Sequence, residues 1–303
     1  MTTIKKSFPI VLASDENYAI PLGIAIFSIL QNRVNNYNIE FFILEDGISE
    51  NEKNKIKKLI NSFSCKVTFI PINKILKDQN LPERGYLRKI AYARIFIPDI
   101  VNREKVIYLD TDIIVNSDIL ELFEQNFESV FLALREPDER KILTKKNDPM
   151  LHNYFNSGVM VINTKKWIEN RITERTIDFI NKYPMKIEFA DQDALNYICQ
   201  DLWDELDRKF NYEIIYNEPY RNLNPIITHY IGSIKPWHYE YPNRISNYRE
   251  YAQMSPWKDN WKTKKTFKKM FCKMWMIFKL ELKKVPGLKN LITKIKYTVC
   301  KKK

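Results

Sequence analysis

The chain has 303 residues, 45% of them hydrophobic and 13% aromatic, which is enough for a large buried core in one large domain or two small ones. Its six glycines form neither of the glycine-rich phosphate loops of dinucleotide-binding and P-loop proteins, and its four scattered cysteines argue against a zinc site or a disulfide scaffold. The net charge of +12 is concentrated at one end, because residues 256–303 hold sixteen lysines and two acidic residues, which leaves −2 for residues 1–255.

Strand and helix patterns alternate along the first part of the chain. The expected strands are residues 8–13, 39–44 and 67–70. An apolar helix pattern over residues 22–30 separates the first two strands, and Ser49 with Glu52 forms a capping box before the helix that precedes the third. This alternation predicts an α/β fold with a right-handed, mostly parallel sheet, helices on both faces and ligands at the carboxyl ends of the strands.

Two carboxylates lie between the apolar residues 106–109 and 113–115. Asp110 and Asp112 stand in i, i+2 spacing, so both side chains can reach one hard cation if Thr111 turns aside. A chain with sixteen aspartates contains about one Asp-x-Asp by chance, and a second one does occur, so the tripeptide alone is weak. The apolar flanks favour a metal site over a solvated turn, because two buried anions repel unless a cation joins them.

Arg94 is the charged residue within the apolar run of residues 92–97. A buried arginine needs an anion. Two partners are compatible with the sequence: a core carboxylate in a structural ion pair, or a sugar or phosphate in the ligand cleft.

A second group of polar residues follows later in the chain. Further strands are expected at residues 130–134 and 158–162, and a further helix at residues 167–180. Asp191, Gln192 and Asp193 then mark a helix start, where Asp191 would be the N-cap and Asp193 would add charge to the first turn. Alternatively, Gln192 between two carboxylates presents polar groups to a sugar ring.

A last strand, beginning at Ile226, is expected to end at His229 and is followed by Gly232 and Lys235. A lone histidine is most often a packed side chain. Here the three residues offer an imidazole ligand, a close backbone approach and a cation for phosphate, which suits a site for a metal and a diphosphate.

Five motifs in order resemble a known family. They are ASDENYA, YLDTDIIV, FNSGVMVIN, DQDALN and HYIGSIKPWH, and the resemblance runs from about Phe8 to His238. Together they are similar to glycosyltransferase family 8, especially its bacterial lipopolysaccharide and lipooligosaccharide galactosyltransferases and glucosyltransferases. The resemblance implies a GT-A fold and retaining transfer of a hexose from a UDP-sugar with a divalent metal, usually Mn²⁺, with Mg²⁺ as an alternative.

The resemblance also implies a role for each matching residue. The metal ligands would be Asp110, Asp112 and His229. The uridine would be held by Ala13, Asp15 and Asn17, and the diphosphate by Gly232 and Lys235. The transferred sugar would be surrounded by Arg94, Asn156, Asp191 and Gln192. Of these, Asp191 is the candidate carboxylate and Gln192 the residue nearest the reacting face, but the family offers no agreed nucleophile, and a same-face ion-pair route is equally compatible.

The chain departs from the family pattern at one position. Related galactosyltransferases carry an aspartate that touches the donor sugar, where this chain has Arg135, Glu136 and Pro137. Glu136 is a substitute for that aspartate, or the sugar differs. UDP-galactose and UDP-glucose therefore both stay open as the donor.

The basic segment predicts a peripheral membrane protein. From Phe267 to Leu282, apolar residues recur at helical spacing while lysines take mainly the other positions, so we expect a basic amphipathic helix that lies on an anionic membrane surface. The alternative is a solvated face in a lysine-rich chain. Nucleic acid is not expected, because the charge follows an apolar stripe. The apolar run near Phe8 is too short for a signal or a membrane span, so we expect a cytoplasmic protein at the inner face of the membrane.

The expected organisation is a glycosyltransferase domain at residues 1–255 and a membrane-associating tail at residues 256–303. The expected activity is transfer of galactose or glucose to a lipid-linked cell-surface glycan. Two alternatives remain: a self-glucosylating enzyme like glycogenin, for which any of the seventeen tyrosines is a potential acceptor, and a non-catalytic sugar-binding module held at the membrane.

Overall fold

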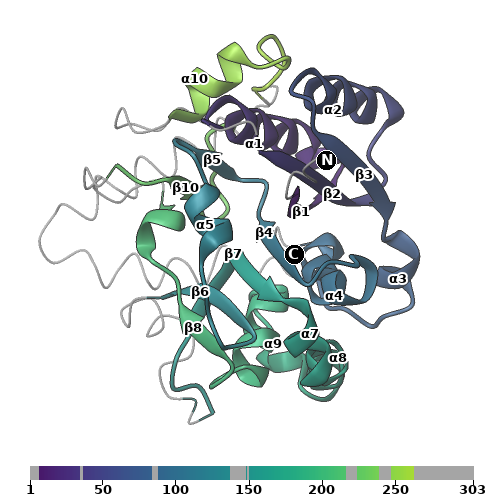
Figure 1. Cartoon of the computed structure of the whole chain (residues 1–303). Helices are drawn as coiled ribbons and strands as arrows, with labels where there is room; N and C mark the ends of the chain where they lie inside the picture. The colour runs from purple at the N-terminus through teal and green to yellow at the C-terminus, as the bar shows by residue number, and fades with distance from the viewer. Residues whose placement is uncertain are drawn as a thin grey trace, which may run out of the picture.

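The computed structural model describes residues 7–34, 37–83, 88–136, 148, 150–215, 224–238 and 247–262 (Figure 1). The strands in this part of the chain are β1 (Ser7–Asp15), β2 (Asn38–Asp46), β3 (Lys66–Pro71), β4 (Lys105–Leu109), β5 (Ile113–Val115), β6 (Phe131–Arg135), β7 (Phe155–Asn163), β8 (Trp203–Glu205), β9 (Tyr212–Ile214) and β10 (Ile227–Tyr230). The α-helices are α1 (Ala19–Gln31), α2 (Glu50–Ser62), α3 (Asn73–Lys77), α4 (Ile97–Ile100), α5 (Leu120–Glu124), α7 (Thr164–Glu169), α8 (Ile172–Lys182), α9 (Ala190–Ile198) and α10 (Asn247–Met254). The 3₁₀ helices are η1 (Glu16–Tyr18), η2 (Lys89–Phe96), η3 (Pro184–Lys186) and η4 (Arg208–Phe210).

A seven-stranded sheet in the order β3-β2-β1-β4-β7-β6-β8 forms the centre of the described chain. The pairs β1–β2, β2–β3, β1–β4 and β6–β8 are parallel, whereas β7 runs antiparallel to both β4 and β6. The predicted mostly parallel sheet is therefore confirmed. The first three strands arise as predicted from apolar runs of strand length, and Ser49 caps α2 between β2 and β3 by accepting from the Glu52 amide at 3.4 Å.

Helices cover both faces of this sheet, as predicted. In β1, Ile10 and Leu12 face the core beneath α1 and α2, while Val11 between them faces the core beneath α3, α4, α7, α8 and α9 (Figure 1). The same alternation in β4 sends Ile107 to the first core and Tyr108 to the second. β1 and β4 are thus buried on both faces, which explains why they are continuous apolar runs rather than alternating ones.

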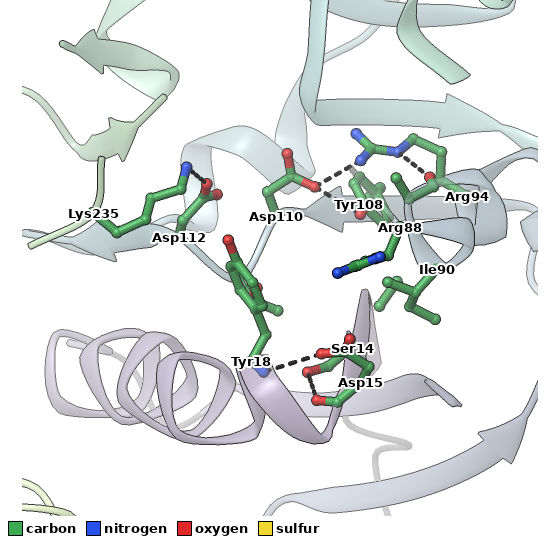
Figure 2. A pocket seen from close by; sticks show the side chains of 13 residues that line it. Ser14, Asp15, Tyr18, Arg88, Ile90, Arg94, Tyr108, Asp110, Asp112 and Lys235 are labelled. Atoms are coloured by element: carbon green, nitrogen blue, oxygen red, sulfur yellow. Dashed lines mark hydrogen bonds and ion pairs between the residues drawn. The ribbon is translucent and has the colours of Figure 1, made fainter. Parts of the chain in front are cut away.

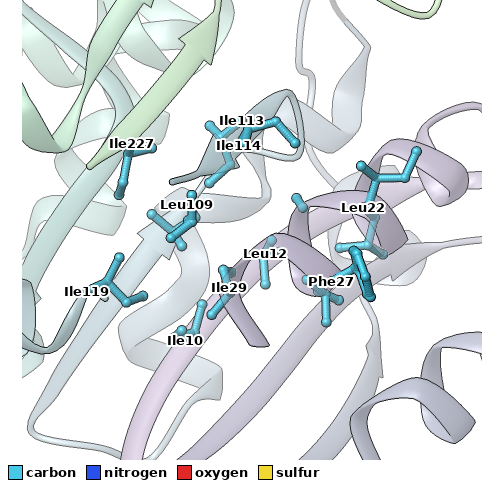
Figure 3. Packing of buried hydrophobic residues seen from close by; sticks show 14 of the residues in the cluster. Ile10, Leu12, Leu22, Phe27, Ile29, Leu109, Ile113, Ile114, Ile119 and Ile227 are labelled. Carbon is cyan, nitrogen blue, oxygen red and sulfur yellow. The ribbon is translucent and has the colours of Figure 1, made fainter. Parts of the chain in front are cut away.

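A three-stranded sheet in the order β5-β10-β9 packs on the α1 side of the large sheet. Figure 3 shows Ile113 and Ile114 of β5 and Ile227 of β10 gathered with Ile29 of α1 and Leu109 of β4 in one apolar cluster. Each such fully buried side chain stabilises the fold by about 1.5–3 kcal/mol relative to an exposed one. This packing anchors β5, which follows Asp110 and Asp112, and β10, which carries His229.

The packed body continues past the predicted boundary between residues 255 and 256. Trp257 is fully buried, its ring occupies the space left by Gly23 in α1, and its Nε1 donates to Glu52 Oε2 at 2.6 Å. Trp261 is buried against Tyr248 of α10. The basic amphipathic segment from Phe267 onward lies outside the described residues, so its helix stays a prediction. No helix within the described ranges is long and apolar enough to cross a membrane.

Candidate active site

A cleft opens at the carboxyl ends of β1 and β4 (Figure 2). This is the edge of the sheet at which a ligand was expected. Six of the predicted site residues line the cleft: Ala13, Asp15, Arg94, Asp110, Asp112 and Lys235.

Asp110, Asp112 and His229 form a triangle at one end of the cleft. One ligand atom from each residue lies within 4.8 Å of the other two. His229 Nε2 is 3.2 Å from Asp112 Oδ1 and 3.7 Å from Asp110 Oδ2. The structure thus brings the three predicted metal ligands together, and the predicted convergence of the two aspartates is confirmed.

Strand pairing brings these residues together. β4 ends at Leu109, and the next residue, Asp110, is held to β7 by its amide, which donates to the Gly158 carbonyl at 2.7 Å. β5 starts at Ile113 in the other sheet and pairs with β10 so that Ile113 lies opposite His229. The aspartates thus occupy the link between two sheets, and the register of β10 sets the histidine beside them.

Lys235 adds a buried positive charge to this end of the cleft. Its Nζ contacts Asp112 Oδ2 and donates to the Tyr230 carbonyl at 2.7 Å. Burial alone would raise the pKa of Asp112, but the Lys235 ammonium group holds that pKa well below its usual range. Asp112 is therefore ionised throughout the physiological range, as a metal-binding carboxylate must be.

Arg94 connects the two groups of carboxylates and is buried. Its NH2 lies 2.9 Å from Asp110 Oδ1, its Nε lies 2.9 Å from Asp191 Oδ2, and its NH1 donates to the Ser157 carbonyl at 2.6 Å. Burial would lower the pKa of Arg94, but Asp110 and Asp191 raise it. Of the two partners that the sequence left open, the structure shows the carboxylates.

Asp191 lies in the first turn of α9. The sequence had suggested that Asp191 is the N-cap of this helix, and that prediction is wrong. The N-cap position belongs to Phe189, and the carboxylate that caps the helix start is Asp193, whose Oδ2 accepts from the amides of Glu188 at 2.6 Å and Phe189 at 2.9 Å. Asp191 instead points to Arg94, because Ala190 adopts the left-handed conformation with φ +48°. Burial raises the pKa of Asp191 to about 7, against the opposing effect of Arg94.

The amides of Gln192 and Asn156 are engaged within the protein. Gln192 Oε1 accepts from the Ser157 amide at 3.1 Å, and its Nε2 donates to Tyr154 Oη at 3.3 Å. Asn156 Oδ1 accepts from the Gly158 amide at 2.9 Å. Both residues lie beside Ser157, so the structure brings the predicted sugar-binding residues into one group around β7.

The other end of the cleft is formed by the end of β1 and η1. Asp15 caps η1, since its Oδ1 accepts from the Tyr18 amide at 3.1 Å, and Asn17 Nδ2 donates to its Oδ2 at 3.2 Å. Asn17 is exposed and does not line the cleft itself, whereas Ala13 and Tyr18 do.

Two further predicted residues lie at the margin of the site. Gly232 has φ +83°, which glycine adopts without strain, and it is exposed in the turn between β10 and Lys235. Glu136 is buried, and its Oε1 accepts from Asn156 Nδ2 at 3.5 Å. Glu136, which stands where related galactosyltransferases carry an aspartate, thus contacts Asn156.

The donor set at the triangle fits a divalent cation. Two carboxylates and one imidazole suit Mn²⁺. The space around them is kept by Gly158, because a Cβ added there would lie 2.2 Å from His229 Cε1 and 2.7 Å from Asp110 Oδ2. Because the backbone conformation of Gly158 is one that any residue adopts, glycine is needed here to leave room for the neighbouring side chains.

Tyr108, Tyr18, Arg88 and Asn211 also belong to the site and were not predicted from the sequence. Tyr108 Oη donates to Asp110 Oδ1 at 2.7 Å, and its ring lies 4.5 Å from the Arg94 guanidinium. Its position two residues before Asp110 on a strand was a usable signal, since such residues share a face. Tyr18 and Arg88 line the cleft, and Asn211 contacts His229. Nothing in the local sequence points to Asn211, because its partners come from distant strands.

Comparison with known proteins identifies the family of the chain. The sequence model of glycosyl transferase family 8 matches residues 9–241. The chain belongs to this family. A putative glycosyltransferase of Haemophilus influenzae is 34% identical over 242 residues, which cover 76% of this chain and 72% of the relative. The lipopolysaccharide 1,2-glucosyltransferase of Escherichia coli K12 is 29% identical, over 81% of this chain and 78% of that protein.

Solved structures of family members share the fold. The galactosyltransferase LgtC, crystallised with donor and acceptor sugar analogues, superposes with a TM-score of 0.68 at 24% identity and covers 82% of this chain and 96% of its own. GlyE of Streptococcus pneumoniae superposes with a TM-score of 0.64 at 26% identity, over 82% of this chain and 61% of its own. The predicted GT-A fold is therefore confirmed, and the chain is a glycosyltransferase.

Proposed function

We propose that this family 8 enzyme transfers galactose or glucose from a UDP-sugar to a lipid-linked cell-surface glycan, with retention and with a divalent cation. The observation that carries the proposal is the triangle of Asp110, Asp112 and His229 beside Lys235. Two carboxylates, an imidazole and a buried ammonium group at one end of a cleft suit a cation together with a diphosphate. A module that only binds sugar has no need of this arrangement, which argues against the non-catalytic alternative.

The chain's own residues supply positioning and charge. A cation bound by Asp110, Asp112 and His229 would supply charge stabilisation to the departing diphosphate. Lys235, held at the Tyr230 carbonyl, adds a second positive charge at the same end.

The opposite end of the cleft offers Ala13, Asp15 and the Tyr18 ring to the nucleoside. In this proposal, nucleoside binding and leaving-group stabilisation are carried by different residues of the cleft.

Arg94 and Asp191 would orient the transferred sugar. Their ion pair places a carboxylate and a guanidinium beside the group of Ser157, Asn156 and Gln192. A nucleophilic role requires Asp191 to be ionised, and its pKa of about 7 makes the ionised fraction depend on pH near neutrality. The same-face route without a covalent intermediate places no such demand on Asp191.

Donor hydrolysis tests the proposal without knowledge of the acceptor. Purified protein is incubated with UDP-galactose or UDP-glucose, with Mn²⁺ or with EDTA, and released UDP is measured. We expect release with Mn²⁺ from one of the two donors and none with EDTA. Release that is independent of metal, or absence of both UDP release and Mn²⁺-dependent UDP binding, would contradict the proposal.

Two variants locate the activity at the triangle. Asp112→Asn removes a ligand and the charge partner of Lys235, so we expect UDP release to fall at least about a hundredfold. Asp118→Asn is the matched control, because Asp118 accepts from Tyr37 Oη at 2.8 Å and the Leu120 amide at 2.7 Å and does not line the cleft. Unchanged release by Asp112→Asn would refute the metal assignment.

The same proposal places the enzyme at the inner face of the cytoplasmic membrane through residues 256–303. The segment holds sixteen lysines, and those between Phe267 and Leu282 alternate with apolar residues at helical spacing, which supports binding to anionic lipid. We expect sedimentation with anionic vesicles at low salt and release at high salt. Equal binding to neutral vesicles at both salt concentrations would refute this part of the proposal.

A further inference from the structure

Asn211 is a fully buried amide between two other polar side chains at the metal end of the cleft. Its Oδ1 lies 2.9 Å from His229 Nδ1, and its Nδ2 donates to Asn156 Oδ1 at 3.0 Å. Asn211 precedes β9, which pairs with β10, so the strand that carries His229 also fixes the backbone beside Asn211.

The direction of these hydrogen bonds follows from one backbone group. The Gly158 amide donates to Asn156 Oδ1 at 2.9 Å, and a backbone N–H has no alternative role. Asn156 must therefore present its oxygen at this point. The atom of Asn211 that meets this oxygen must be a donor, which is Nδ2, and this leaves Oδ1 of Asn211 facing His229.

The tautomer of His229 follows in turn. Because Asn211 Oδ1 only accepts, His229 Nδ1 must carry a proton. In the neutral ring, the lone pair then lies on Nε2, the atom that faces Asp112 Oδ1 at 3.2 Å and Asp110 Oδ2 at 3.7 Å. The imidazole is thus oriented to ligate a cation through Nε2.

We infer that Asn211 is a positioning residue that, through the chain from Gly158 and Asn156, holds His229 with Nδ1 protonated and Nε2 directed at the cation site. This inference rests on the proposed metal-dependent transfer. It assigns Asn156 a positioning role through Asn211.

The first test is the tautomer of His229 in metal-free wild-type protein. The chain has three histidines, so ¹⁵N NMR at alkaline pH, with His229 assigned by substitution of the others, resolves each ring. We expect the Nδ1–H form for His229. The Nε2–H form would overturn the inference, whatever the activity of the enzyme.

The second test uses two substitutions at position 211. Asn211→Leu removes the acceptor and keeps the approximate size, so we expect Mn²⁺ affinity, measured by calorimetry, to fall about 10- to 100-fold. Asn211→Asp retains an acceptor for Nδ1–H, so it should keep the tautomer and lose less affinity than Asn211→Leu. Wild-type affinity in Asn211→Leu, with the Nδ1–H form retained, would overturn the inference.

Asn116→Ala is the matched control. Its Nδ2 donates to Thr228 Oγ1 at 3.0 Å and to the Pro225 carbonyl at 2.9 Å, so it anchors the same strand without touching the imidazole ring. We expect unchanged Mn²⁺ affinity and an unchanged tautomer. An equal loss of affinity in Asn116→Ala and Asn211→Leu would show a merely structural role and overturn the inference.

The two proposals fail in different ways. Wild-type protein that binds no Mn²⁺ and releases no UDP would refute the proposed function. In that case the NMR measurement on metal-free protein still decides the tautomer, and Asn211→Asp serves if Asn211→Leu does not fold.

Discussion

The two ends of the cleft are built in opposite ways. At the metal end, Arg94, His229 and Lys235 are 6%, 3% and 3% exposed, and their partners come from strands far apart in the sequence. At the nucleoside end, Asp15 is half-buried, Asn17 is exposed, and the bonds of Asp15 reach only two or three residues along the chain. A buried charge depends on its partners, whereas an exposed one is solvated by water.

This difference predicts how substitutions act. Substitutions at the metal end should lower both the stability of the fold and the metal affinity. Each one leaves a buried polar or charged group without a partner, and that group keeps its desolvation penalty. Changes at the nucleoside end should alter donor affinity with a small effect on folding. The following substitutions examine this contrast, from the largest expected effect to the smallest.

The largest effect is expected for Arg94→Leu. It leaves Asp110 and Asp191 without their shared cation, so the free energy of unfolding in EDTA should fall by about 3–5 kcal/mol. Arg103→Leu is the control, because Arg103 pairs with Glu40 at 2.8 Å near the surface and should cost less than about 1 kcal/mol. Urea denaturation measures both, and equal losses would contradict the contrast.

The second substitution, Asp191→Asn, tests the raised pKa. In wild-type protein treated with EDTA, the Asp191 pKa is about 7 in the folded state, against an ordinary value of 3.8. The unfolded chain therefore binds fewer protons between these pH values, so stability falls as the pH rises. The amide that replaces the carboxyl group in the variant does not titrate. From pH 5 to pH 7.5, the variant should gain about 2–3 kcal/mol relative to wild type. A difference that is constant with pH, or of opposite sign, would show that Arg94 keeps the carboxylate ionised.

The third substitution, Gly158→Ala, tests the space around the metal ligands. Its Cβ would lie 2.2 Å from His229 Cε1, so the imidazole must move away from the aspartates. We expect Mn²⁺ affinity to fall about 10- to 100-fold, measured by calorimetry. Gly47→Ala is no suitable control because of its φ of +78°, but Ala133→Gly on the neighbouring β6 alters a buried residue outside the site and should leave affinity unchanged. Wild-type affinity in Gly158→Ala would refute the steric argument.

The smallest effect is expected for Asp15→Ala. It removes the cap of η1 and one polar group of the nucleoside end, so we expect a loss of about 1 kcal/mol in stability. The KM for the UDP-sugar should rise while Mn²⁺ affinity stays unchanged, as steady-state kinetics and calorimetry would show. A loss of Mn²⁺ affinity would mean that the two ends of the cleft are coupled.

The sequence predicted which residues belong to the site better than it predicted the residues that they contact. The first strand, expected at residues 8–13, and the capping of α2 by Ser49 depend on a few neighbouring residues, and both are confirmed. The N-cap at Asp191 was wrong, because the left-handed Ala190 turns that side chain to Arg94 and leaves the cap to Asp193. Sequence spacing alone does not show which of two aspartates in one turn caps the helix.

By itself, the sequence determined the alternation of strands and helices, the polar residues at the strand ends and the order of the family motifs, because strand period, capping and turn chemistry act over a few residues. Only the tertiary structure decided that β10 pairs with β5 in the register that sets His229 beside Asp112, that Asn211 meets His229, and that Trp257 fills the space over Gly23. These contacts join distant segments. They depend on which arrangement buries both faces of the sheet and leaves each buried polar group with a partner, and that is a property of the whole chain.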